Sequence, residues 1–279
     1  MNMFLFADDT TLTHSCNNFG TLVETTNYEL CKVSDWFKAN KLSVNATKTN
    51  YVFFGTKKIP DASLYQISLN GVVLARVDNI KFLGVYIDEK LTWYKHASFV
   101  SINVAKSCAI INRIKHIFPT NITLMLYYTL VYLYLNYCCV IWGSACETNL
   151  LVLNSLQRRV IRNIGRLDYT APVADLFRQL KIMSIEQIYK FQVLSLVYRI
   201  KYQLVPRVCF RYITLNSGTI HSTRFLSEFK LFYYRTNIRK RSFVISGPEL
   251  WNTLPVPLTN SPSLLIFMRL VKDWLFESC

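Results

Sequence analysis

A stretch of thirty residues without a charged side chain, from Ile117 to Cys146, constrains this chain more than any other feature. Its central part, Ile122–Trp142, is long enough to cross a lipid bilayer. However, five tyrosines are spread along that part, whereas the aromatic residues of a membrane span gather at its two ends. We therefore expect a core helix of a water-soluble domain and no membrane partner. A membrane anchor is the alternative.

Positive charge is concentrated in the second part of the chain. Residues 1–110 contain 11 Lys and Arg and 9 Asp and Glu, and residues 111–279 contain 21 and 8. The net charge is therefore +2 before residue 111 and +13 after it. Such an excess predicts a polyanionic partner, nucleic acid above all, although a solvated basic surface would have the same composition. Hydrophobic residues make up 51% of the chain, which is enough for a sizeable core and argues against disorder.

The eight cysteines show no metal-site or disulfide pattern. None of them lies in a CxxC pair or is matched to a pair of histidines, as a zinc site would require. Scattered cysteines among apolar neighbours usually behave as small buried residues. Met1–Phe6 is too short for a signal peptide, and we expect an intracellular protein of the nucleus or cytoplasm.

The hydrophobic pattern changes near residue 95 and predicts an α+β chain. Before it, we expect a helix from Asn17 or Asn18 to Asn40, a hairpin around Asn70-Gly71 and strands at Tyr51–Phe54 and Lys81–Ile87, the latter interrupted by Gly84. After it, four long helical patterns are separated by Pro and Gly: Ala97–Phe118, Ile122–Trp142, Leu150–Gly165 and Ile185–Gln203. The domains expected are 1–95, a helical 96–221 and a basic, aromatic 222–279. In the last, Gly247-Pro248 and Pro255/Pro257 are expected breaks.

Two adjacent carboxylates, Asp8 and Asp9, lie between short apolar runs near the start of the chain. Apolar strands on both sides predict a β-hairpin with the two acids at its tip. Burying two anions without partners is prohibitive, so an exposed pair that binds Mg²⁺ is plausible chemistry. A fixed carboxylate of this kind is what two-metal phosphoryl transfer requires. An ordinary turn or helix cap is the alternative for the dipeptide taken alone.

Further motifs follow the aspartate pair in a definite order. They are Phe6–Asp9 (FADD), Trp36–Asn45 with Lys48-Thr49, Phe82–Asp88 (FLGVYID), Leu135–Tyr137 with Trp142-Gly143, Leu156–Arg159, and Gly247-Pro248 with Leu250–Asn252 and Leu254-Pro255. This ordered set resembles the reverse transcriptases of jockey-like, LINE-type non-LTR retrotransposons. The resemblance extends over nearly the whole chain, from about residue 4 to about residue 275.

The resemblance implies RNA-directed DNA polymerisation with Mg²⁺, an RNA template and a DNA primer. It implies a partial palm at 1–95, a helical thumb at 96–221 and a basic extension. Asp8 would bind the metal and Asp9 would assist it. Lys48 would lie near the pyrophosphate leaving group, unless it is a surface lysine. Phe82, Leu83 and Gly84 would hold the primer end, although Phe82 and Leu83 would also suit a strand core.

One element of the family's active site is not found in this chain. The family uses a further metal-binding aspartate on a strand that precedes the FADD segment, and Asp35, Asp61, Asp78 and Asp88 do not match it by motif. We therefore expect the chain to be the C-terminal part of a reverse transcriptase and a poor polymerase by itself. Nucleoside triphosphates would bind only with the preceding palm and fingers supplied. The alternative is a non-catalytic nucleic-acid-binding remnant of a decayed mobile element.

Two basic clusters are candidates for nucleic-acid contact. In the first, arginines recur at helical steps beside apolar residues: Arg158, Arg159, Arg162 and Arg166. Such a face suits bidentate phosphate contacts, but it is equally typical of a solvated helix surface. The second cluster lies beside Phe232, Tyr233 and Tyr234, and combines charge with aromatic rings that can stack on bases. Its members are Arg235, Arg239, Lys240 and Arg241.

Overall fold

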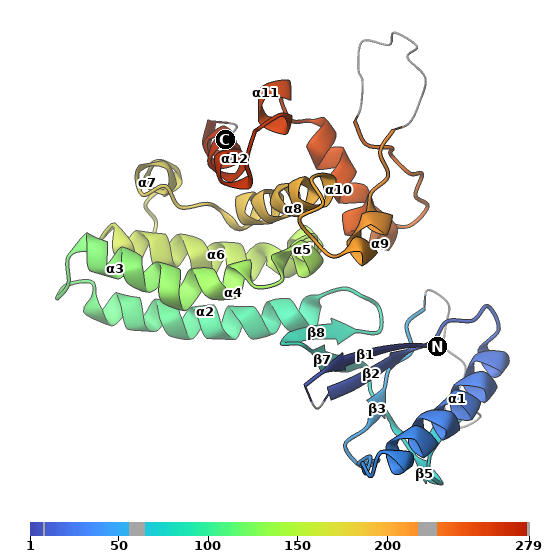
Figure 1. Ribbon diagram of the computed structural model, residues 1–279. Coiled ribbons are helices and arrows are strands. Elements are labelled where there is room, and N and C mark those ends of the chain that lie inside the picture. Colours follow the sequence, from blue (N-terminus) through green and yellow to red (C-terminus); the bar gives the residue numbers. More distant parts are fainter. Residues whose placement is uncertain (8, 56–64, 217–227, 278–279) are drawn as a thin grey trace. The chain divides into compact units, whose positions relative to one another are not determined.

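The computed structural model describes residues 1–7, 9–55, 65–216 and 228–277 (Figure 1). The chain divides into two compact units, Met1–Leu91 (unit 1) and Thr92–Cys279 (unit 2). Unit 1 combines one long helix with short strands, and unit 2 is helical. The predicted α+β class is confirmed. The described residues of the basic C-terminal segment belong to unit 2.

Unit 1 contains short paired strands and a single long helix in its described part. The elements are β1 (Asn2–Phe6), β2 (Asp9–Thr13), α1 (Phe19–Ala39), β3 (Asn50–Tyr51), β4 (Ser68–Leu69), β5 (Val72–Val73), β6 (Ala75–Arg76), β7 (Asn79–Phe82) and β8 (Val85–Asp88). Three pairs are antiparallel hairpins (β1–β2, β4–β5 and β7–β8), and β3 pairs with β6 in parallel. The strand expected at Tyr51–Phe54 is therefore shorter than predicted, because pairing with β6 covers only Asn50–Tyr51.

Helix α1 has the caps that its sequence predicts. The Asn18 side chain accepts a hydrogen bond from the backbone N–H of Thr21, at 3.3 Å, and the helix ends at Asn40. Such an N-cap supplies a partner for one of the backbone donors left over in the first turn. Val23 and Leu30 are buried in a small core that includes Phe53, Ile67, Leu69 and Leu74. The predicted helix is confirmed.

Two tight turns shape the second half of unit 1. Asn70 and Gly71 have φ values of 53° and 76°, which the two-residue hairpin predicted there requires. The strand expected at Lys81–Ile87 is interrupted at Gly84 as predicted, but its two parts are antiparallel strands of a hairpin. Leu83 and Gly84 have φ values of 44° and 83°, so the chain reverses direction and forms the β7–β8 hairpin in place of one strand.

Unit 2 is built around three long helices, α2 (Tyr94–Ile114), α6 (Glu147–Ile164) and α8 (Ile185–Lys201). Its other elements are α3 (Thr120–Tyr127), η2 (Tyr128–Tyr132), α4 (Leu133–Asn136), α5 (Cys139–Trp142), α7 (Ala174–Gln179), η3 (Arg207–Tyr212), α9 (Asn237–Lys240), α10 (Phe243–Asn252), α11 (Val256–Thr259) and α12 (Leu264–Glu277). In Figure 1, α2, α3, α4 and α6 run along one another, and α8 is flanked by α10 and α12. Helices α2, α3, α4, α6 and α8 share one core.

The uncharged segment forms a broken core helix, and in the described residues no helix is both long and apolar enough to span a membrane. Five residues spaced by four, Thr123, Tyr127, Val131, Leu135 and Cys139, are all buried. Four residues turn an α-helix by about 400°, about 40° more than one full turn. The wider π-helical turn at η2 offsets that drift as far as Leu135, and α3, η2 and α4 all contact α2. The helix predicted over Ile122–Trp142 is then interrupted at Cys138, where φ is 49°.

The C-terminal part corrects one further prediction. Gly247 and Pro248 do not break a helix, because both are buried inside α10. A Cβ on Gly247 would lie 3.2 Å from Cγ2 of Val197, so glycine allows α10 to pack closely on α8. The backbone remains helical through Pro248, although proline within a helix costs about 3 kcal/mol. The expected break at Pro255 is confirmed, since α10 ends at Asn252 and α11 begins at Val256.

Candidate polymerase hairpins and nucleic-acid interface

The β1–β2 hairpin carries the aspartate pair. Phe6 and Asp9 are directly opposite each other as the last residue of β1 and the first of β2. Ala7 has a φ of 51° in the turn between them, and Asp8 lies outside the described residues. Asp9 is exposed, so its carboxylate is accessible to a ligand. The predicted β-hairpin is confirmed in β1 and β2, with Asp9 as the first residue of β2.

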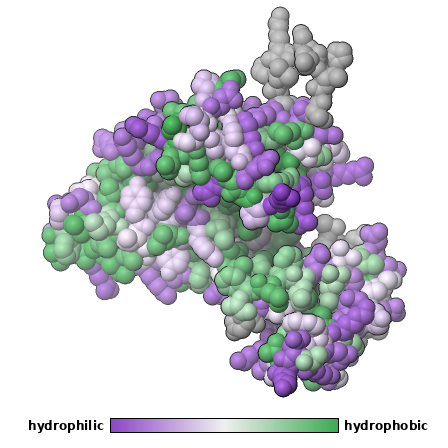
Figure 2. Space-filling view, viewed as in Figure 1, coloured by the Kyte–Doolittle hydropathy of each residue, from purple (hydrophilic) through white to green (hydrophobic). Residues whose placement is uncertain are grey.

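An apolar surface accompanies this hairpin. Met3, Phe4, Leu5 and Phe6 are 48 to 61% exposed, and Figure 2 shows hydrophobic surface over the part of unit 1 where Figure 1 draws the hairpin. In the described part of the chain, β1 pairs only with β2. A two-stranded hairpin is marginally stable by itself in water, so packing of these side chains would stabilise the aspartate turn.

A divalent cation could bind at the β1–β2 turn only through the carboxylate groups that lie there. An exposed carboxylate oxygen at the end of a strand is the kind of ligand that Mg²⁺ accepts, usually with retained water and with phosphate oxygens of the substrate. Asp9 fits that description. Among the described residues, no group of three or more His, Cys, Asp or Glu is arranged to hold a metal ion.

Lys48 lies in a compact exposed turn of unit 1. The side-chain oxygen of Asn45 accepts hydrogen bonds from the backbone N–H groups of Thr47 and Lys48, at 3.1 and 3.3 Å, and the Asn45 carbonyl accepts one from the Thr49 hydroxyl, at 2.9 Å. These bonds fix the turn while the Lys48 side chain remains exposed. The position suits a cation that meets an anionic ligand at the surface.

The three residues expected to hold a primer end lie in the β7–β8 turn. Phe82 pairs with Val85 across a two-residue loop, Leu83 is 40% exposed, and Gly84 supplies the positive φ that costs glycine least. The turn presents backbone and an apolar side chain at the surface. Asp9, Lys48 and this turn lie on three different segments of unit 1.

The arginines of the first basic cluster have two different roles. Arg158 and Arg159 are exposed on α6. Arg162 is half-buried, and its Nε donates a hydrogen bond to the carbonyl of Ala171 at 2.8 Å. Arg166 donates one to the carbonyl of Phe118 at 3.1 Å. Arg162 and Arg166 therefore hold neighbouring loops in place, and Arg158 and Arg159 present their guanidinium groups to solvent.

The second basic cluster lies on an exposed segment of unit 2. Arg235, Arg239, Lys240 and Arg241 are all exposed, Arg239 and Lys240 in α9. The Lys240 ammonium group lies 5.9 Å from the centre of the Tyr234 ring. Unit 1 contains nine Lys and Arg and nine Asp and Glu, so the whole formal charge of +15 belongs to unit 2. A unit with this net positive charge attracts polyanions over a range of about 10 Å at physiological salt.

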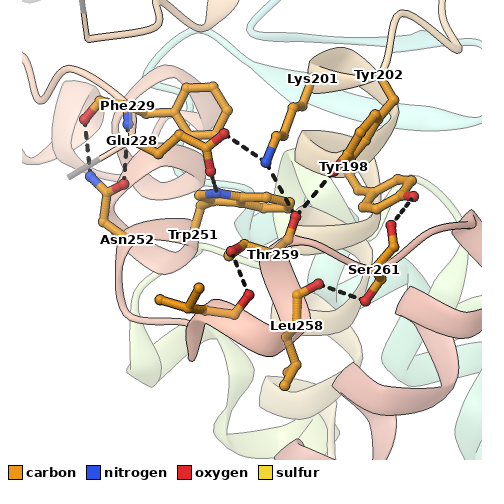
Figure 3. A network of polar contacts seen from close by, with 11 residues as sticks. Tyr198, Lys201, Tyr202, Glu228, Phe229, Trp251, Asn252, Leu258, Thr259 and Ser261 are labelled. Carbon is orange, nitrogen blue, oxygen red and sulfur yellow. Dashed lines mark hydrogen bonds and ion pairs between the residues drawn. The ribbon is translucent and has the colours of Figure 1, made fainter. Parts of the chain in front are cut away.

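A polar network that sequence reasoning missed holds the start of this segment (Figure 3). The indole N–H of Trp251 donates to the Glu228 carboxylate at 2.8 Å, and the same carboxylate pairs with the Lys201 ammonium group at 2.6 Å. The Asn252 side chain donates to the Phe229 carbonyl and accepts from the Phe229 N–H, at 3.0 and 3.2 Å. The only sequence signal for it was the Leu250–Asn252 motif itself, whose partners are more than twenty residues away.

Comparison with known proteins identifies relatives of this chain. Over 184 residues it is 24% identical to the probable RNA-directed DNA polymerase from transposon X-element of Drosophila melanogaster. Over 186 residues it is 26% identical to the probable RNA-directed DNA polymerase from transposon BS of the same organism. The chain is related to these transposon polymerases. The resemblance to non-LTR reverse transcriptases predicted from the ordered motifs is confirmed.

The matches cover 64% and 65% of this chain and 20% of each transposon polymerase. The chain therefore spans about a fifth of the length of the curated relatives it matches. No protein-family model matches the chain, and no solved structure matches it significantly.

Proposed function

We propose that this chain supplies a catalytic aspartate hairpin and the primer- and template-binding helical unit of an RNA-directed DNA polymerase from a non-LTR transposon. The observation that carries the proposal is its similarity to two transposon polymerases over about two thirds of its length. The β1–β2 hairpin, which brings the FADD segment to an exposed turn, supports the same function. In this reading unit 1 is part of the palm and unit 2 includes the thumb.

Asp8 and Asp9 are the proposed ligands of Mg²⁺. When bound, the ion would stabilise negative charge on the phosphates during attack by the primer 3′-hydroxyl. The chain's own residues would do the rest. Lys48 would stabilise charge on the departing pyrophosphate, and the Phe82–Gly84 turn would contact the end of the primer.

Paramagnetic broadening by Mn²⁺, used in place of Mg²⁺, tests the metal site without requiring polymerisation. We expect Mn²⁺ to broaden the amide signals of residues in the β1–β2 turn selectively. Asp8→Asn is expected to abolish the effect, and Asp78→Asn, in an exposed acid elsewhere in unit 1, serves as the matched control. Equal broadening in the wild-type chain and in Asp8→Asn would refute this assignment.

Nucleic-acid binding without polymerisation is the second candidate function. The observation that favours it is that the whole net charge of +15 belongs to unit 2. Two-metal catalysis, by contrast, needs carboxylates from more than one strand. Primer extension on a primed RNA template with Mg²⁺ distinguishes the two. Products that disappear in Asp8→Ala would establish polymerisation by this chain, and binding without products would favour the second candidate.

A further inference from the structure

Residues 230–241 of unit 2 form a segment that we call the basic strap. It contains five cations, Lys230, Arg235, Arg239, Lys240 and Arg241, and no acidic residue. All five are exposed. Its second half is α9, whose N-terminal turn is capped by the Thr236 hydroxyl. The strap is therefore a short exposed segment that contains cations and no opposing charge.

Both ends of the strap are fixed to the helical core. At its start, Phe229 is 1% exposed, its N–H donates to the Asn252 side-chain oxygen and its carbonyl accepts from the Asn252 amide group. The adjacent Glu228 binds Trp251 and Lys201 (Figure 3). At its end, the chain enters α10, where the Ser246 hydroxyl accepts a hydrogen bond from the Tyr189 hydroxyl at 2.9 Å. Fixed ends limit the conformational entropy that the strap would lose when it binds a ligand.

Exposure alternates along the first half of the strap. Leu231, Tyr233 and Arg235 are exposed, whereas Phe232 and Tyr234 are half-buried. The half-buried rings each lie within 6 Å of a strap lysine, Phe232 near Lys230 and Tyr234 near Lys240. Tyr233 is 83% exposed, the most exposed large aromatic side chain among the described residues. The two half-buried rings thus lie near lysines of the strap itself, and the ring of Tyr233 is left on the outside among the cations.

We propose that the basic strap binds single-stranded nucleic acid, with Tyr233 stacking on a base and Arg235, Arg239 and Arg241 contacting phosphates. This inference rests on the proposed function, because it names the part of unit 2 that contacts the strand and the form of nucleic acid it prefers. An exposed ring among cations suits a single strand, since a base must be unstacked to pack on it. The bases of a duplex are already stacked on one another, so a duplex would contact only the charged side chains of the strap, through its phosphates.

The test is the affinity of the full chain for a fluorescent oligo(dT), measured by anisotropy, against a DNA duplex of equal phosphate number. Stacking on aromatic side chains is worth ~1–3 kcal/mol per base, so Tyr233→Ala is expected to weaken oligo(dT) binding by roughly 5- to 150-fold. Duplex binding and the salt dependence should change little. Tyr233→Phe keeps the ring and should bind as the wild type does. Tyr169→Ala, in a tyrosine 76% exposed elsewhere in unit 2, is the matched control.

The outcomes separate this inference from the proposed function. If the wild-type chain binds in a salt-sensitive way and Tyr233→Ala binds oligo(dT) equally well, the strap inference is wrong and nucleic-acid binding stands. If the wild-type chain does not bind either nucleic acid, both fail. If Tyr233→Ala loses co-sedimentation with phosphatidylserine vesicles but keeps its affinity for oligo(dT), the strap is a membrane-binding surface and the inference is overturned.

Discussion

Gln157→Leu should reveal how much the motif around the exposed arginines of α6 contributes to folding. Gln157 is 2% exposed. Its amide N–H groups donate to the Tyr127 hydroxyl at 3.0 Å and to the Met183 carbonyl at 2.9 Å, and its carbonyl accepts from the Ile185 N–H at 3.2 Å. One side chain thus links α6 to α3 and to the start of α8.

The expected cost follows from the partners that leucine cannot satisfy. All three partner residues are buried, and a buried group left without its hydrogen bond costs about 1–3 kcal/mol. Leucine has a similar volume and gains some free energy from burying its methyl groups. We therefore expect the free energy of unfolding of unit 2 to fall by about 3 kcal/mol, at ~1 kcal/mol per lost hydrogen bond.

Hydrogen exchange at individual backbone amides measures the stability of unit 2 separately from that of unit 1. Backbone amides of α6 and the first turn of α8 should exchange roughly 100-fold faster in Gln157→Leu, since each 1.4 kcal/mol is a factor of ten in the opening equilibrium. Ser155→Ala changes an exposed residue of the same helix and should leave these rates unchanged. A change of less than threefold in Gln157→Leu would show that the buried amide is not a structural link.

Four other substitutions test separate parts of the account. Arg158→Ala should reduce the salt slope of nucleic-acid binding by about 0.7–0.9. Arg162→Ala should lower the free energy of unfolding by about 1.5–3 kcal/mol, because the hydrogen bond to the Ala171 carbonyl is lost. Urea titration of the two variants should show a loss of stability in Arg162→Ala and none in Arg158→Ala. Gly84→Ala should lower stability in thermal unfolding by ~1–2 kcal/mol, because φ is +83°. Burial lowers the pKa of His96 to about 4. In the unfolded chain this histidine has a pKa of ~6.5 and binds more protons than in the folded chain, so stability should fall by about 2.5 kcal/mol between pH 6.5 and 4. His96→Gln should remove that component of the pH dependence in urea titrations; an unchanged pH profile would contradict the assignment.

Local signals in the sequence were sufficient for several elements. Asn18 and Asn40 mark the ends of α1, and Asn70-Gly71 marks the β4–β5 hairpin, because caps and tight turns depend on one or two residues. Gly84 predicted an interruption between β7 and β8, but the reversal of the chain there was missed because leucine rarely adopts the positive φ that Leu83 has. The break at Cys138 could not be predicted, because no Gly or Pro marks it. The Tyr137 carbonyl next to the break accepts a hydrogen bond from the Trp142 indole N–H.

The candidate site was predictable to the extent that it depends on contiguous motifs. The FADD segment predicted a hairpin with Asp9 at its end, and the structure has that hairpin. Helical spacing placed Arg158 and Arg162 in one cluster. It could not show that Arg162 binds the Ala171 carbonyl whereas Arg158 faces solvent. The anchoring of the basic strap depends on contacts over more than twenty residues, which no short pattern contains.

The most direct test of the proposed function is the binding of an RNA template annealed to a DNA primer, measured as a function of salt. We expect the whole chain to bind with a log–log slope of several units, at roughly 0.7–0.9 for each phosphate contact. Arg158→Ala combined with Arg235→Ala and Arg239→Ala should lower that slope by about two units or more. An affinity that stays flat between 50 mM and 200 mM salt, or a slope unchanged in the triple variant, would contradict the assignment of unit 2 as the primer- and template-binding part.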